Sequence, residues 1–320
     1  MVAVALVAGA FVVRSRRDNA TASGGPGSTV PGATTTRARP AGPLRVVCAT
    51  ELKAVCAGLG ADRATTSSAD AGATLAAVSG GDAAGVLDVW VTLDPWPQMA
   101  DLTTDVFTDD ALVLGAGAVG FAIRKPRADV LSAACKGTIT TQCIGTQAGL
   151  PWSTVGGQAT WGTVKPVFDR PTTSAVGLVA YTAAVVAPPA PASLARIDLE
   201  NDDAFMRWAR QFGQFSQQMN PSQGTAMEQA RQLSRYDIVL TTEQDHRAVA
   251  GDSFTFVALA PVQAHVVAAA RNGVKLPTAL ADELAKLTQD LGWNAPVRAT
   301  SLPTPAAVAG LQEIWKQATA

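Results

Sequence analysis

Short apolar runs alternate with helical patterns along the first part of the folded region. LRVVCA at 44–49 and VLDVWV at 86–91 are almost continuously apolar, which is typical of strands buried in a sheet. A further β segment is expected around 63–68, and helices are expected at about 51–58 and 71–79. Strands separated by single helices indicate βαβ units and a parallel sheet. This pattern predicts an α/β fold.

The rest of the chain continues this alternation after two extended segments, 111–114 and 119–124. TVKPVFD at 163–169 is predicted to be a strand, and Pro171 after it suits the start of a helix over about 173–187. Further helices are expected near 127–136, from Asn201, near 278–291 and from Thr304-Pro305, and further strands at 236–241 and 254–261. The order of elements predicts two lobes between which the chain crosses.

Two local patterns have a direct structural interpretation. Thr172 or Thr173 is the expected N-cap of the helix after Pro171, because a hydroxyl oxygen can accept a free backbone N–H there. The helix that starts near Asn201 carries aromatic residues on one face, spaced for packing in the core. These residues are Phe205, Trp208, Phe212 and Phe215.

The glycines of Gly115–Gly120 match the GxGxxG pattern of dinucleotide-binding proteins. Three observations argue against that interpretation. Pro126 follows only six residues after the last glycine, where the cofactor-binding helix should continue. The residues up to Arg124 have the pattern of a strand, and 136–147 contain no acidic residue to bind a ribose. We therefore predict no cofactor and attribute the glycines to a crossing between lobes.

Composition excludes several classes of function. The chain has 320 residues, of which 48% are hydrophobic and 16% charged, and its net charge is −1. Lys and Arg are spread along it, so no nucleic acid is expected as a partner. The two histidines, His246 and His265, have no partner at metal-ligand spacing, and neither GxSxG nor HExxH occurs. We predict no metal, no catalytic residues and no enzyme activity.

The N-terminal region has the pattern of a membrane anchor followed by a tether. Residues 1–13 are apolar and precede three arginines, but a spanning helix needs about 20 apolar residues. We interpret 1–13 as part of a longer signal-anchor, the alternative being a misassigned start of a cytosolic protein. Residues 18–43 hold 16 Gly, Pro, Ser or Thr among 26, and we expect 14–43 to be a disordered tether.

The four cysteines form two pairs with equal spacing. Cys48 and Cys56 are eight residues apart, as are Cys135 and Cys143, and no CxxC motif occurs. Two local disulfides in an oxidising compartment are expected. The alternative is four buried free thiols.

Five blocks of sequence, in their order and spacing, resemble the type II periplasmic-binding-protein superfamily. They are LRVVCATEL, SADAGATLAAVSGGD, LDVWVTLDPWPQ, VKPVFDRPTTSAVGLVAYTAAVV and YDIVLTTEQD. The resemblance is to extracellular solute-binding proteins of the molybdate/sulfate-like branch, especially envelope-anchored forms, and covers about 44–320. It implies two α/β lobes, a cleft between them and closure around one small solute. We expect lobe 1 at 44–120 and 246–320, and lobe 2 at 121–245.

Four turns between a strand and a helix are the expected ligand site. Ligands of open α/β sheets bind outside the carboxyl ends of the strands, where helix N-termini present free N–H groups. Each Thr or Ser could instead only cap its own helix. The residues of these turns are Thr50, Glu51, Gly72, Ala73, Thr74, Thr173, Ser174, Ala175, Thr242 and Glu243.

Acidic residues next to these turns restrict the chemistry of the solute. Carboxylates of Glu51, Glu243 and Asp94 would repel a buried oxyanion. Either they point away from the cleft, or the solute is neutral or carries an amine. Trp90 and Trp96 could stack on a ligand, although packing in the core is the more common role of buried tryptophan.

The sequence thus predicts a membrane-tethered, extracellular solute-binding protein. The expected partners are a small-molecule solute, the membrane through the N-terminal segment, and an ABC permease. The alternative is an envelope scaffold or sensor that reuses the fold without transport, with a von Willebrand A-type envelope protein as partner.

Overall fold

In the described residues, seven strands form one sheet in the order β2-β1-β3-β7-β4-β6-β5. The structure is a computed structural model that describes residues 42–108, 111–233, 236–296 and 302–320. The strands are β1 (Leu44–Ala49), β2 (Ala64–Ala69), β3 (Val89–Leu93), β4 (Leu112–Arg124), β5 (Pro166–Val167), β6 (Ile238–Thr242) and β7 (Phe254–Ala270). The helices are α1 (Lys53–Gly58), α2 (Ala71–Ala77), α3 (Ala83–Val86), α4 (Trp96–Asp101), α5 (Lys125–Ala134), α6 (Thr141–Gln147), α7 (Ala175–Val186), α8 (Arg196–Glu200), α9 (Asp203–Gly213), α10 (Ala226–Leu233), α11 (Glu243–Val249), α12 (Thr278–Asp290) and α13 (Pro305–Thr319). The predicted α/β class is confirmed.

The sheet is parallel at its two ends and antiparallel in the middle. β1 runs parallel to β2 and β3, with Val47 opposite Ser67 on one side and Trp90 on the other. β5 is parallel to β6 at the opposite end. β7 is antiparallel to β3 and β4, and β4 is antiparallel to β6. Helices connect the parallel strands because a parallel pair needs a crossover.

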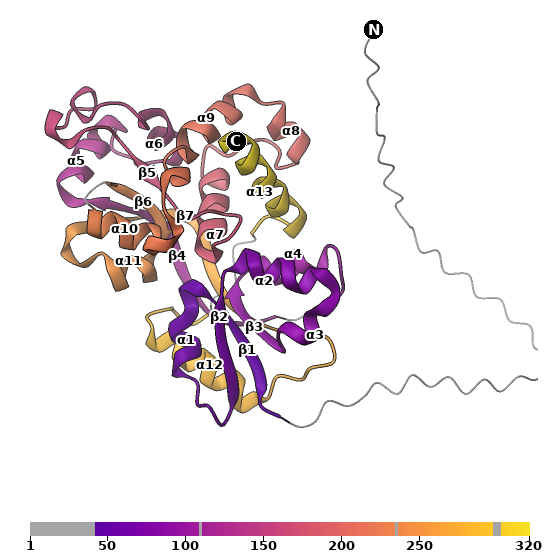
Figure 1. Cartoon of the computed structure of the whole chain (residues 1–320). Coiled ribbons are helices and arrows are strands. Elements are labelled where there is room, and N and C mark those ends of the chain that lie inside the picture. The colour runs from indigo at the N-terminus through magenta and orange to yellow at the C-terminus, as the bar shows by residue number, and fades with distance from the viewer. Residues whose placement is uncertain (1–41, 109–110, 234–235, 297–301) are drawn as a thin grey trace, which may run out of the picture. The chain divides into compact units, whose positions relative to one another are not determined.

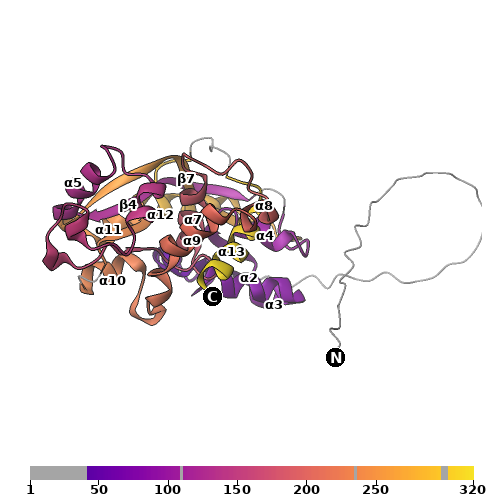
Figure 2. The same ribbon diagram turned by 90° about the horizontal axis from the view of Figure 1, so that it is seen from above.

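The long strands β4 and β7 join the two halves of the sheet. β4 has 13 residues and β7 has 17, and they pair with each other along most of their length. β3 pairs with residues 266–270 of β7, whereas β6 pairs with residues 119–123 of β4. Both strands therefore extend from one half into the other, as Figures 1 and 2 show. The fold is two-lobed, with these strands shared between the lobes.

The glycines of the GxGxxG pattern lie inside β4 and not at the start of a helix. A Cβ on Gly117 would lie 2.1 Å from Oε1 of Gln244, and one on Gly120 would lie 2.3 Å from the carbonyl oxygen of Val257. The β4–β7 register shifts between Ala118 and Gly120. The glycines thus allow close approach of backbone and side chains where β4 crosses between the lobes, and the predicted strand up to Arg124 is confirmed.

Three element predictions are corrected by the structure. Segments 111–114 and 119–124 form a single strand, because the glycines between them stay extended. The strand expected at 163–169 is only two residues long, Pro166–Val167, and Pro166 has no N–H to donate to a ladder. β7 is longer than the predicted 254–261 because the apolar run continues to Ala270.

The N-cap of α7 is also corrected. Neither Thr172 nor Thr173 caps this helix; the Oγ of Ser174 accepts the backbone N–H of Gly177 instead. α7 is buried from Ala175 to Val185, as expected for a helix that is apolar on every side.

The aromatic face of α9 packs in the core, as predicted. Phe212 stacks on Trp208 and Phe168, with ring centroids 5.1 and 5.3 Å apart, and Phe168 stacks in turn on Tyr181 of α7. Phe215 is buried just beyond the end of the helix. These rings join α9, α7 and the segment after β5.

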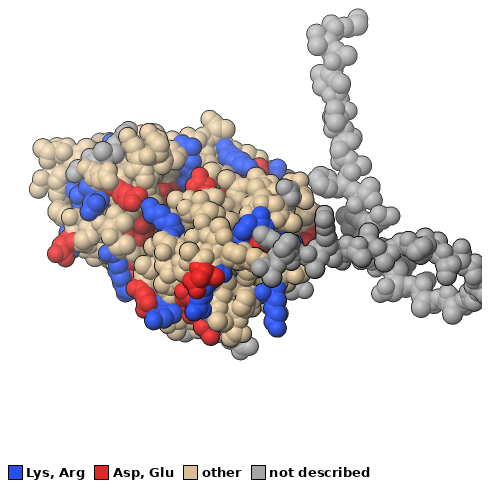
Figure 3. Space-filling model, turned by 60° about the horizontal axis from the view of Figure 1, so that its bottom comes forward, with Lys and Arg blue, Asp and Glu red and all other residues tan. Residues whose placement is uncertain are grey.

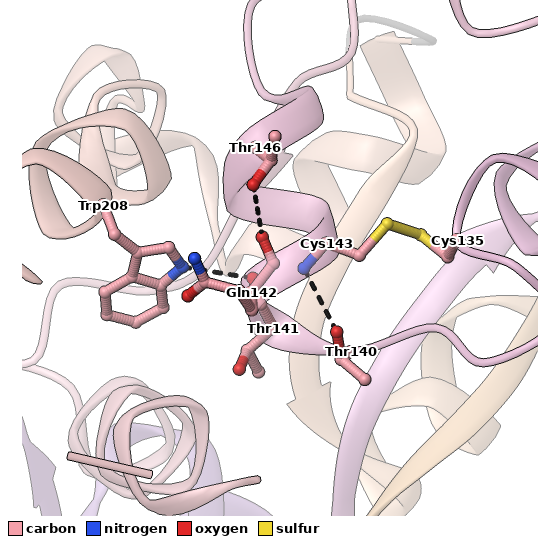
Figure 4. Close-up of a disulfide and its surroundings, with 7 residues drawn as sticks. All are labelled: Cys135, Thr140, Thr141, Gln142, Cys143, Thr146 and Trp208. Atoms are coloured by element: carbon pink, nitrogen blue, oxygen red, sulfur yellow. Dashed lines mark hydrogen bonds between the residues drawn. A yellow bond between two sulfur atoms is a disulfide. The ribbon is translucent and has the colours of Figure 1, made fainter. Parts of the chain in front are cut away.

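Both predicted disulfides are present. Cys48 at the end of β1 bonds Cys56 of α1, with Cα atoms 6.0 Å apart. Cys135 and Cys143 join the end of α5 to α6, with Cα atoms 5.8 Å apart (Figure 4). On the side of α6 opposite this disulfide, the indole N–H of Trp208 donates to the carbonyl of Thr141, which ties α6 to α9 (Figure 4).

The predicted anchor at 1–13 and nearly all of the predicted tether at 14–43 lie outside the described residues. Within the described ranges, no helix is both long and apolar enough to cross a bilayer. Acidic and basic side chains are interspersed on the face shown in Figure 3. Among the described residues, Glu313 and Lys316 form an exposed ion pair within α13.

The predicted lobe boundaries remain a prediction. α12 packs against α1 and β4, next to the first strands. α11 packs against α10 and β6, and α13 packs mainly against α8 and α9. The segment 246–320 is predicted to return to lobe 1. α13 lies within this segment and α11 overlaps its start, yet both helices contact elements of the second half.

In the described residues, one buried aspartate immediately precedes β3 and another immediately precedes β6. Asp88 precedes β3 and pairs with Arg45 and Arg271. Asp237 precedes β6, and its Oδ1 lies 3.0 Å from Nε of Arg127 and 3.6 Å from Nε of Arg124. The indole N–H of Trp152 donates to the other oxygen. A buried carboxylate is tolerated here because two guanidinium groups balance its charge and the Trp152 indole donates one hydrogen bond to it.

We expect Asp237→Ala to lower the free energy of unfolding by about 3–5 kcal/mol, because two largely buried guanidinium groups lose their counter-charge. Chemical denaturation measures the loss. Glu313→Ala is the control, and removing its exposed pair with Lys316 should change stability by less than about 1 kcal/mol. Equal losses in the two variants would contradict a structural role for the buried cluster.

Candidate functional site

A cavity of about 350 Å³ lies where the two halves of the fold meet. It is at the lower end of the size range of ligand pockets, roughly 300–1,000 Å³. Residues from the first half that line it are Thr50, Glu51, Lys53 and Asp70. Residues from the second half are Asp169, Arg170, Thr173, Ser174, Met219, Pro221, Gly224, Thr225, Glu228, Asp245, Ala248 and Val249.

The cavity lies at the carboxyl ends of strands from both halves. Glu51 follows β1, Asp70 follows β2, Asp169 follows β5, and Asp245 is in the first turn of the helix after β6. Polar residues collect there because parallel strands end at a common edge, where the next helices begin. This is the position that the sequence predicted for a ligand.

Three of the four predicted turns meet at this place. The backbone N–H of Gly72 donates to the carbonyl of Thr173 over 3.1 Å. The hydroxyl of Ser174 donates to Oε1 of Glu51 in a short hydrogen bond. A Cβ on Gly72 would lie 2.1 Å from the carbonyl oxygen of Thr172, so only glycine permits this approach. The two halves are therefore in direct contact beside the cavity.

Of the ten predicted residues, four line the cavity: Thr50, Glu51, Thr173 and Ser174. Gly72 is at the contact between the halves, and the other five have different surroundings. Ala73 is exposed, Ala175 is buried in α7, and the hydroxyl of Thr74 donates to the carbonyl of Asp70.

The fourth predicted turn faces elsewhere. Thr242 caps α11 by accepting the backbone N–H of Asp245, and Glu243 pairs with Arg247 on the outer side of that helix. Neither Thr242 nor Glu243 lines the cavity. Glu243 thus points away, which was one of the two possibilities left open for the acidic residues.

Four carboxyl groups that the sequence analysis did not single out also line the cavity: Asp70, Asp169, Glu228 and Asp245. Oδ1 of Asp169 accepts the backbone N–H of Ala226 at the start of α10, and Oδ2 of Asp245 accepts the hydroxyl of Thr241. Glu228 and Thr225 form a capping box. A Thr-x-x-acid spacing at 225–228 and 242–245 was the available signal in the sequence.

Burial and the repulsion between neighbouring carboxylates raise the pKa values of three carboxyl groups in the lining. Burial raises the pKa of Asp245 to about 6, an effect increased by the charges of Glu51 and Glu228 and opposed by the Thr241 hydroxyl. Burial also raises the pKa of Asp169 well above its usual value, with Asp245 and Glu51 adding to the rise. The pKa of Glu51 is raised by burial too, although Ser174 lowers it.

The two cations of the lining do not neutralise this cluster. Nη2 of Arg170 donates to the main-chain carbonyls of Gln217 and Met219. Lys53 has an exposed position. Oε2 of Glu51 is buried and has no hydrogen-bond partner in the structure. The cavity therefore has an excess of acceptors that carry negative charge.

Other parts of the molecule fit a ligand site less well. Trp90 and Trp96 are fully buried and contact each other with ring centroids 6.4 Å apart, so the idea that they stack on a ligand is wrong. A second cavity of about 280 Å³ next to Trp208 has Asp202 in its lining, but that carboxylate already caps α9. In the described part of the chain, no cluster of three or more His, Cys, Asp or Glu could hold a metal ion.

No protein-family model matches the chain, and no curated protein matches it. Solved structures do match. One is a periplasmic thiamin binding protein, with a TM-score of 0.55 and 14% identity over 87% of this chain and 96% of that one. Another is iron-bound HitA from Pseudomonas aeruginosa, with a TM-score of 0.55 and 12% identity over 86% and 99% of the two chains.

A third is the periplasmic binding protein AfuA from Actinobacillus pleuropneumoniae with fructose-6-phosphate bound, at a TM-score of 0.53 and 12% identity over 86% and 96%. At such identities the likeness concerns the fold. It agrees with the two lobes, the shared long strands and the cavity between them. The chain has the two-lobed α/β fold of the type II periplasmic binding proteins.

Proposed function

We propose that this protein is an extracytoplasmic solute-binding protein that captures a small molecule in the cavity between its lobes. The observation that carries the proposal is the convergence of strand ends from both lobes on one cavity. Ligands of open α/β sheets bind at such a place. The proposed role is binding without catalysis, followed by delivery to an ABC permease.

Capture requires the lobes to move, and the connection between them suits a hinge. β4 and β7 cross from one lobe to the other, with register shifts in β4 at Gly115 and Gly120. Hinges are commonly a few residues at such irregular positions. The contacts of Gly72 with Thr173 and of Glu51 with Ser174 join the lobes beside the cavity. We propose that these contacts form on closure.

The proteins with a similar fold bind chemically different ligands. Their names give thiamin for one, iron for another and fructose-6-phosphate for a third. The fold alone therefore does not choose a ligand, and the side chains that line the cavity must do so.

The proposed location is outside the cytoplasm, with the folded domain tethered to the membrane by the N-terminal segment. Two disulfides, Cys48–Cys56 and Cys135–Cys143, are compatible with an oxidising compartment. In the described residues, nothing favours the alternative role as a scaffold or sensor, or a von Willebrand A-type partner.

The first test is a thermal-shift screen of the purified domain against organic cations including thiamin, amino acids, sugars, sugar phosphates and oxyanions. A ligand at 100 times its Kd should stabilise the folded state by about 2.7 kcal/mol, which corresponds to several degrees in Tm. We expect at least one solute to reach this shift and to bind with 1:1 stoichiometry by calorimetry. A complete screen without stabilisation would count against capture.

The second test concerns the contact between the lobes. Gly72→Ala places a Cβ against the carbonyl of Thr172, so we expect the free protein to become more open and its radius of gyration in small-angle X-ray scattering to increase. Gly80→Ala is the matched control, because nothing lies within 4 Å of its added Cβ. Identical scattering of both variants and the wild type would show that this contact does not hold the lobes together.

A further inference from the structure

We propose that the cavity selects an organic cation, whose charged group is held between the carboxylates of Glu51, Asp169 and Asp245. This inference rests on the proposed function, since it assigns a ligand class to the same cavity. The inference follows from three features of the lining: its excess of carboxyl groups, the buried Oε2 of Glu51 and an apolar wall.

The charge of the lining favours a cation. Five carboxyl groups line the cavity, against Lys53 and Arg170. An anion placed there would add to the repulsion that these carboxylates already exert on one another, whereas a cation would relieve it. Burial and mutual repulsion raise the pKa values of Glu51, Asp169 and Asp245, which disfavours their charged forms in the empty cavity, and a bound cation would favour those charged forms.

Glu51 gives an independent indication. Its Oε1 accepts the hydroxyl of Ser174 from the opposite lobe, while Oε2 is buried and accepts no hydrogen bond from the described residues, although the backbone N–H groups of Glu51 and Val176 lower the pKa of this carboxyl group. An N–H donor of a ligand would satisfy this oxygen, and a charged donor forms the stronger bond. Because Glu51 already contacts Ser174, a ligand bound to it would also favour the closed arrangement.

The rest of the lining indicates an organic ion and not a bare metal. Met219, Pro221, Ala248 and Val249 give the cavity an apolar wall. A carbon skeleton can cover that wall, whereas a metal ion cannot. The acidic groups also lack the arrangement of a metal site in the described residues, since Asp169 and Glu228 are engaged by the first turn of α10.

Binding should depend on pH. Asp245 is faced by Glu51 from the turn after β1, by Glu228 from α10 and by Asp169 from the segment after β5. His246, next to it, lies over Phe256 and near the carbonyl of Phe254. With a pKa of about 6, Asp245 becomes protonated below that pH and loses the charge that attracts a cation. Affinity for a cation should therefore fall as the pH falls from 7.5 to 5.

The same cluster should reduce the stability of the free protein at neutral pH. A carboxyl group whose pKa is higher in the folded state binds more protons there than in the unfolded chain, so stability falls as pH rises through that range. We expect Asp245→Asn to raise the Tm of the ligand-free protein at pH 7.5 and to weaken its dependence on pH between 4 and 7. If Asp245→Asn instead lowers the Tm, the Asp245 carboxylate stabilises the ligand-free protein, and its assignment to cation binding is contradicted.

The experiment sorts the solutes that stabilise the protein by charge. Agmatine, spermidine and choline represent organic cations, and 3,3-dimethylbutan-1-ol is the neutral isostere of choline. Alanine tests a neutral zwitterion, sulfate and phosphate test anions, and Ca²⁺ and ferric citrate test metals. Affinities of the solutes that bind are then measured by calorimetry at pH 7.5 and 5. We expect the binders to be organic cations, with at least tenfold weaker affinity at pH 5.

Variants identify the groups that hold the charge. Glu51→Gln, Asp169→Asn and Asp245→Asn should each weaken binding of the cation at least tenfold at pH 7.5, the usual size of an effect of one charged hydrogen bond. Glu243→Gln is the matched control on α11, because this residue pairs with Arg247 outside the cavity, and affinity should stay within twofold.

The outcomes separate this inference from the function on which it rests. If neutral, anionic or metal ligands bind and organic cations do not, the charge assignment is overturned and solute capture stands. Equal affinity for choline and its neutral isostere would also overturn it. If no solute of any charge binds, solute capture and the ligand class both fail.

Discussion

The pairing of β4 with β7 is the interaction on which the rest of this structure depends. The two strands hold β3 and β6 in one sheet, although these strands belong to different lobes. Glycine at 120 permits their close approach, because a Cβ there would lie 2.3 Å from the carbonyl oxygen of Val257 in β7. Because both lobes are built on the same strand pair, the ends of their other strands are brought to one cavity. The proposed hinge at this pair and the cavity beside it both follow from this one arrangement.

Two kinds of buried carboxylate show how the fold separates stability from function. Asp88 and Asp237 are close to the amino ends of central strands and are each satisfied by two arginines. At the opposite, carboxyl ends, Asp169 and Asp245 face a cavity and other carboxylates. Burial raises the pKa of Asp237 as well, but Arg127 and Arg124 oppose that rise, whereas the carboxyl groups facing Asp245 and Asp169 add to it. Sites that bind ligands often carry such unfavourable groups, because the ligand supplies the missing partner.

The shape of the cavity and the nature of its walls come from segments far apart in the sequence. Glu51 and Ser174 are 123 residues apart and share a hydrogen bond. Asp169 is bound by the first turn of α10, 57 residues later. These contacts place acidic groups from both lobes next to one another, and they set the proposed preference for a positive solute. The similar solved structures share the fold at 12–14% identity, so this preference belongs to the side chains of this chain.

The sequence by itself determined the alternation of strands and helices, the two local disulfides and the strand character of the residues around Gly120. These features depend on neighbours within a few residues, where apolar periodicity and short spacing decide the outcome. It also identified Glu51 and Ser174, because both follow the ends of strands. Only the tertiary structure decided that Glu243 faces outward while Asp245, two residues later, faces the cavity. The direction of a helix relative to the opposite lobe selects between them, and no local pattern contains that direction.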